Sequence, residues 1–100
     1  MPLSVTVDEA QLYVNALLVD VRTKREWQQG HIEGAVHLPV GGITAESAGV
    51  LPKNKSLVVY CAVGVRANRA AEKLRALGFA ATAVREGGFA ELKAASRRSP

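Results

Sequence analysis

Two short, uninterrupted apolar segments constrain the fold of this chain more than any other feature. They occupy residues 17–21 (LLVDV) and 57–60 (LVVY), and both are rich in valine. A strand that is covered on both faces has a continuous apolar sequence, whereas a half-exposed strand alternates between apolar and polar residues. We therefore predict that both segments are central strands of a parallel sheet.

Weaker strand patterns and helical patterns surround these two segments. The strand patterns cover residues 5–7, 81–84 and 35–38, the last stopped by Pro39. The clearest helical pattern covers residues 67–77, where a stripe of alanine and leucine faces one side and Gly78 is well placed to end the helix. Shorter helices are predicted at residues 8–13 with Asp8 as cap, after Thr23 with Glu26 completing a capping box, and at residues 88–94.

The alternation of strands and helices predicts an α/β fold. We expect a mostly parallel central sheet of about five strands, with helices on both faces. The 100 residues form one domain, with a core at about residues 5–93 and a frayed tail at residues 94–100. In such sheets the functional sites lie at the carboxyl ends of the strands, where loops lead into helices.

Composition excludes several classes of protein. One cysteine allows no internal disulfide, and no Cys/His cluster has metal-ligand spacing, which excludes disulfide scaffolds and zinc fingers. No apolar run approaches the roughly 20 residues that cross a bilayer, and no signal peptide is evident, which predicts a cytoplasmic protein without membrane contact. The net charge of +4 favours small anions or acidic partners, but it is too scattered to predict nucleic-acid binding.

The lone Cys61 stands directly after the predicted buried strand. Residues 62–66 (AVGVR) then form a tight loop into the next helix. Backbone N–H groups in such a loop converge on one point, the helix dipole adds positive potential, and Gly64 can adopt the positive φ that the turn requires. This field favours a thiolate, which is the nucleophilic form, and Arg66 adds a cation. The alternative is an inert thiol that fills the core, as free cysteines often do.

Three motifs in this sequence resemble those of rhodanese-like domains. The first runs from Asp20-Val21-Arg22 through Glu26-Trp27 to residues 30–35 (GHIEGA) and Leu38-Pro39. The second is the loop CAVGVRA of residues 61–67, and the third is EGGF of residues 86–89. In their order they cover roughly residues 5–93, which makes the resemblance specific.

The resemblance implies sulfur transfer through a persulfide on Cys61, and it implies that neither a metal nor an organic cofactor is required. The partners would be a small anionic sulfur donor such as thiosulfate, a thiol or cyanide as acceptor, and possibly a protein that delivers or receives sulfur. Backbone N–H groups of residues 63–67 would hold the persulfide, and Arg66 would bind the anionic donor. The residues assigned to substrate binding are Ala62, Val63, Gly64, Val65, Arg66 and Ala67.

Three other functions stay open. The same cradle suits a persulfide carrier, or a rhodanese-like binding module without catalysis. A cysteine phosphatase or arsenate reductase is disfavoured, because those enzymes place five residues between cysteine and arginine where this chain has four. The smaller ring fits a single sulfur atom better than a phosphate.

The remaining polar residues have structural interpretations. Asp20 ends a central strand and could orient Arg66 or Arg22, and we expect it to pair locally with an arginine. We expect His31 to bond backbone in a turn, and His37 to be a surface or satisfied core side chain.

The apolar and glycine residues near the motifs also have structural interpretations. Trp27 is expected to cover the sheet, and Gly87 and Gly88 to allow a close turn. Leu92 stands where the family commonly has tryptophan, and should still anchor the last helix.

Overall fold

Five parallel strands form one sheet in the computed structural model, which describes residues 2–97. The strands are β1 (Ser4–Val5), β2 (Leu17–Asp20), β3 (Val36–His37), β4 (Ser56–Tyr60) and β5 (Ala80–Val84). Their order is β1-β5-β4-β2-β3, and every neighbouring pair is parallel. The predicted α/β fold with about five strands is confirmed.

The middle of the sheet is the strand β4, between β5 and β2. Its residues 57–60 are at most 1% exposed, which explains why the sequence there is apolar throughout. Leu57 and Val59 point to one face of the sheet, and Val58 and Tyr60 to the other. Cys61 follows at the carboxyl end of this most buried strand.

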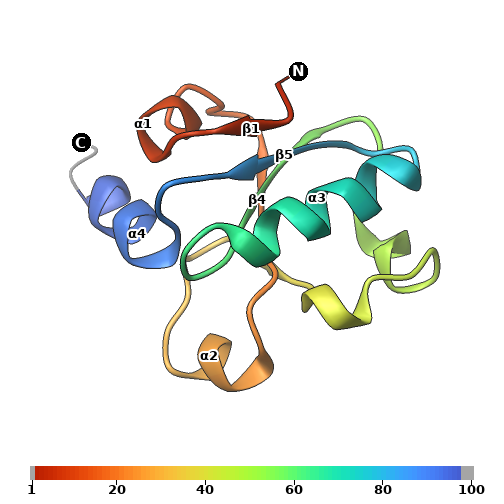
Figure 1. Ribbon diagram of the computed structural model, residues 1–100, viewed down its shortest axis with the longest axis horizontal. Coiled ribbons are helices and arrows are strands. Elements are labelled where there is room, and N and C mark those ends of the chain that lie inside the picture. The colour runs from red at the N-terminus through yellow and green to blue at the C-terminus, as the bar shows by residue number, and fades with distance from the viewer. Residues whose placement is uncertain (1, 98–100) are drawn as a thin grey trace.

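Helices cover both faces, as predicted. The helix α3 (Val65–Ala76) packs on the first face through Ala67, Ala70, Ala71 and Leu74, together with the short helical segments η1 (Val40–Gly42) and η2 (Ser47–Val50). The helices α1 (Val7–Ala10) and α4 (Phe89–Arg97) lie together on the second face, and Figure 1 shows them side by side at the left. None of the helices within residues 2–97 has the length and apolar content needed to cross a bilayer.

The starts of two helices show how the local sequence sets their bounds. The helix α2 (Lys24–Gln28) begins after Thr23, whose hydroxyl accepts from Glu26 N–H in the predicted capping box. In α1 the cap is Thr6, paired with Glu9, so the prediction of Asp8 as cap was wrong. Because Thr6 already starts the helix, β1 ends before Val7, and α1 ends at Ala10 instead of extending to residue 13.

The last helix is longer than the sequence suggested. Its anchor is Leu92, which is 4% exposed and packs among the buried residues of the second face, as expected for the leucine in this position. The helix continues to Arg97, and Ala95 is also buried. The tail predicted from residue 94 is therefore wrong for residues 94–97, and residues 98–100 lie outside the described part of the chain.

The start of α4 is fitted directly against the end of β4. Phe89 N–H donates a hydrogen bond of 2.8 Å to the carbonyl oxygen of Cys61. A Cβ atom on Gly88 would overlap the carbonyl oxygens of Cys61 and Ala62, so this position has room only for glycine. Glu91 closes the turn, because its Oε1 accepts from Gly88 N–H at 2.8 Å.

We expect Gly88→Ala to destabilise the protein by at least about 1–3 kcal/mol, the usual cost of inserting atoms into a packed site. Gly49→Ala is the matched control, since a Cβ there meets nothing within 4 Å. Its change in unfolding free energy should stay within about 0.5 kcal/mol. Urea unfolding of the two variants measures the difference, and equal stabilities would contradict the close contact at Gly88.

Candidate active site

The sulfur of Cys61 lies inside the loop that joins β4 to α3. The residue is 0% exposed, and its Sγ accepts hydrogen bonds from Gly64 N–H at 3.0 Å and from Ala67 N–H at 3.3 Å. These two donors belong to the group of N–H donors expected from the sequence. Gly64 is the N-cap of the 12-residue helix α3 and Ala67 lies in its first turn, so both are at the amino end that carries positive potential. Such donors stabilise a sulfur that carries negative charge.

Glycine is required at the turn of this loop. Gly64 caps α3 with a φ of 100°, in the left-handed region that glycine enters without strain. A Cβ there would lie 3.4 Å from the carbonyl oxygen of Val84. The positive φ expected at Gly64 is confirmed, and it aims the N–H group at the sulfur.

Arg66 is held by a carboxylate from another element. Its Nη1 and Nη2 donate to the two carboxylate oxygens of Glu26, at 2.6 and 3.0 Å. Glu26 belongs to α2, and about a third of each side chain is exposed. The first turn of α3 and the helix α2 are thus joined by an ion pair with two hydrogen bonds.

The ion pair changes the titration of both partners. The pKa of Glu26 is lowered from 4.5 to about 2, chiefly by the Arg66 hydrogen bonds and also by those of Thr23, against an opposing effect of burial. The same bonds raise the pKa of Arg66 above its ordinary value. Glu26 is therefore ionised throughout the range in which proteins are usually studied.

A second arginine near the loop is buried in a different ion pair. Arg22, 4% exposed, binds the carboxylate of the fully buried Asp20, with an Nη2–Oδ2 distance of 2.8 Å. Its Nη2 also donates to the carbonyl oxygen of Gly30 at 2.7 Å, and its guanidinium lies 3.9 Å from the centre of the Phe89 ring. Asp20 thus pairs with Arg22, while Arg66 pairs with Glu26. This arrangement braces the end of β2 against the start of α4.

The two histidines bond to backbone carbonyls. His31 Nδ1 lies 3.1 Å from the oxygen of Trp27, and His37 Nε2 lies 2.8 Å from the oxygen of Arg22. The Trp27 ring stacks on both imidazoles, with centroid distances of 3.6 Å to His31 and 4.8 Å to His37. These contacts give all three rings a structural role beside α2.

Two apolar side chains near Cys61 in the sequence are exposed. Val63 is 70% exposed and Val65 is 76% exposed, so neither is held in the core. They add apolar area to the surface next to the start of α3.

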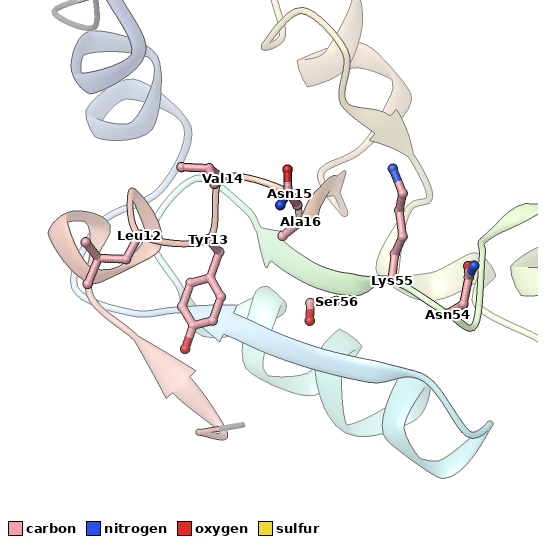
Figure 2. A pocket seen from close by; sticks show the side chains of 8 residues that line it. All are labelled: Leu12, Tyr13, Val14, Asn15, Ala16, Asn54, Lys55 and Ser56. Carbon is pink, nitrogen blue, oxygen red and sulfur yellow. The ribbon is translucent and has the colours of Figure 1, made fainter.

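Other features of the chain lie away from the sulfur. A hollow of about 390 Å³ is lined by residues 12–16 and by Asn54, Lys55 and Ser56, at the amino ends of β2 and β4 (Figure 2). Cys61 follows the opposite end of β4. Across residues 2–97, no three His, Cys, Asp or Glu side chains are grouped to hold a metal ion.

Sequence reasoning missed two residues that shape this site. Glu26 was interpreted only as the capping-box partner of Thr23, yet its carboxylate also binds Arg66, 40 residues further along the chain. Gly88 was expected to allow a close turn next to the loop, but not for the reason that a Cβ atom there would overlap the carbonyl oxygens of Cys61 and Ala62. The double glycine was a visible signal, whereas no local spacing indicates the pair between Glu26 and Arg66.

Comparison with known proteins places these features in a family. The family model for the rhodanese-like domain matches residues 6–95. The crystal structure of a rhodanese-like domain protein from Staphylococcus aureus has a TM-score of 0.78 and 32% identity, and the match covers 89% of each chain.

Two curated relatives have names that mention sulfur chemistry. The chain is 34% identical over 62 residues to the thiosulfate sulfurtransferase PspE of Escherichia coli strain K12, which covers 61% of this chain and 60% of that protein. It is also 34% identical over 62 residues to the putative sulfur carrier protein YrkF of Bacillus subtilis strain 168, which covers 62% of this chain and 33% of that protein. The relatives include sulfurtransferases, and this chain belongs to the rhodanese-like domain family.

Proposed function

We propose that the protein is a sulfurtransferase that carries sulfur as a persulfide on Cys61. The observation that supports this most directly is the pair of N–H donors, from Gly64 and Ala67, that reach the buried Sγ. The loop holds one sulfur atom, and the family and the name of PspE agree with sulfur transfer. No metal or organic cofactor enters the chemistry.

In the first half-reaction the thiolate of Cys61 attacks the outer sulfur of a sulfane donor. With thiosulfate, a new bond forms between Sγ and that sulfur, and the S–S bond of the donor breaks. The bonding electrons leave with sulfite, so the total charge is unchanged. The loop N–H groups then surround the terminal sulfur of the persulfide, and Arg66 attracts the anionic part of the donor.

In the second half-reaction a nucleophilic acceptor removes the terminal sulfur. Cyanide gives thiocyanate, and a thiolate gives a new persulfide, and in both cases the electrons of the broken S–S bond return to Cys61 as a thiolate. This two-step scheme needs a reduced cysteine, which fits a cytoplasmic location.

A persulfide carrier is the second candidate, and the name of YrkF favours it. The exposed Val63 and Val65 also suit it, because they offer apolar contact to a protein that delivers sulfur. An enzyme turns over repeatedly with thiosulfate and cyanide, whereas a carrier is loaded once and waits for its partner.

Intact mass spectrometry tests the persulfide. We expect the wild-type protein to gain the mass of one sulfur atom after incubation with thiosulfate, because the cradle stabilises the product, and to lose it with cyanide. Cys61→Ser should gain nothing, since serine is a far weaker nucleophile. A wild-type mass that stays constant with thiosulfate and with an organic persulfide would contradict the proposal.

Arg66→Ala tests the role of the arginine. We expect kcat/KM for thiosulfate to fall about tenfold or more, because a charge-assisted contact to the donor is lost. Unfolding free energy should fall by only about 1 kcal/mol, because the pair with Glu26 is partly exposed.

Arg69→Ala is the matched control, since Arg69 is exposed on the same helix one turn further along. It should retain the wild-type kcat/KM for thiosulfate. If kcat/KM for thiosulfate falls equally in Arg66→Ala and Arg69→Ala, the effect comes from the total positive charge of α3 and not from a specific contact of Arg66.

A further inference from the structure

The arginine that would attract an anionic donor already holds an anion. Both Nη atoms of Arg66 are bonded to the carboxylate of Glu26, at 2.6 and 3.0 Å. Thiosulfate presents oxygen atoms and two negative charges to the same guanidinium. For sulfonate oxygens to take those positions, the Glu26 carboxylate has to move away or share the cation.

Glu26 is fixed where it stands. Its Oε1 accepts from Thr23 N–H at 2.9 Å and from the Thr23 hydroxyl at 3.1 Å, in addition to Arg66 Nη1. Displacing the carboxylate from Arg66 therefore leaves a negative charge beside the incoming anion. The pKa of about 2 keeps that charge in place through the neutral range.

Arg22 provides no free positive charge to an incoming anion. Arg22 is neutralised by the buried Asp20, and its guanidinium lies against Phe89. At the sulfur itself, attraction comes from the N–H groups of Gly64 and Ala67 and from the amino end of α3. Those N–H groups point at the sulfur of Cys61, so they would bind the transferred sulfur atom and would not bind a sulfonate group.

We propose that Glu26 is a specificity-determining residue, whose carboxylate competes inside the protein with anionic donors for Arg66. The site then disfavours thiosulfate and favours donors without an oxyanion next to the transferred sulfur, namely organic persulfides. This selectivity rests on the proposed function. With a persulfide the thiolate of Cys61 attacks the outer sulfur, the donor S–S bond breaks, and the donor thiolate leaves with the electron pair while the transferred sulfur keeps its proton.

The test uses sulfate, an unreactive dianion with the oxygen geometry of a sulfonate. Binding is followed by NMR through the amide signals of Gly64 and Ala67, so no sulfur transfer is needed. We expect sulfate to bind Glu26→Gln about three- to tenfold more tightly than it binds the wild type, because the competing charge is gone. The KM for thiosulfate should fall by a similar factor, so the ratio of kcat/KM for thiosulfate to kcat/KM for an organic persulfide should rise.

Glu9→Gln is the matched control. Glu9 closes an equivalent capping box with Thr6, and its nearest cation is Arg85, 3.6 Å away on an exposed surface. Glutamine supports a capping box as glutamate does, so both variants keep their helix starts and lose the same charge. Sulfate should bind Glu9→Gln as it binds the wild type.

A double-mutant cycle shows whether the effect passes through Arg66. In an Arg66→Gln background, Glu26→Gln should no longer tighten sulfate binding. The ratio of sulfate affinities between Glu26→Gln and the wild type should also stay constant from about pH 5 to about pH 8, since Glu26 remains ionised there.

Two results would overturn the inference. If Glu26→Gln binds sulfate with the same affinity as the wild type, Glu26 does not compete with anions. If Glu26→Gln binds sulfate more weakly, Glu26 instead positions Arg66 for anion binding. Neither result would affect the proposed persulfide on Cys61, which is tested separately by intact mass spectrometry. If sulfate binds Glu26→Gln more tightly but no persulfide forms on Cys61, the competition between Glu26 and anions is supported and the proposed sulfur transfer is rejected.

Discussion

A buried ion pair at the end of β2 holds the parts of the site in place. Removing Asp20 and Arg22 from water costs several kcal/mol of desolvation free energy for each ion. The attraction between them offsets this cost only when their geometry is good and their remaining donors and acceptors are hydrogen-bonded. The bonds of Arg22 to Asp20 and to the Gly30 carbonyl, with the Phe89 ring against its guanidinium, supply that environment. Phe89 in turn bonds the backbone of Cys61. A chain of contacts thus runs from the ion pair to Cys61.

The central strands of the sheet could be predicted because a strand that is buried on both faces has a continuous apolar sequence. Residues 17–21 and 57–60 are apolar for that reason, and Thr23 with Glu26 has the spacing of a capping box. The same spacing in Thr6 and Glu9 was equally visible, and the choice of Asp8 overlooked it. The length of α4 was not visible, because the burial of Ala95 depends on the packed structure around it.

In the candidate site, too, some contacts could be predicted from local sequence and others could not. Cys61, Gly64 and Ala67 lie within seven consecutive residues, so local sequence places the sulfur beside the start of a helix. The pair of Arg66 with Glu26 and the fit of Gly88 against Cys61 join segments that are far apart in the chain. They exist only once the sheet brings α2, α3 and α4 to one edge. The local part of the site therefore sets the hydrogen bonds to the sulfur of Cys61, and the distant part sets the ion pair of Arg66.

The order of the strands also determines when the sheet can be completed. The first strand, β1, pairs only with the last, β5, through Ser4 with Ala83 and Val5 with Val84. During synthesis β1 waits without this partner until residues 80–84 have been made. Parallel pairings at such separation form slowly, because the loop between them must close first. The sheet is therefore completed only when its first and last strands meet, after the segment that carries Cys61 has been synthesised.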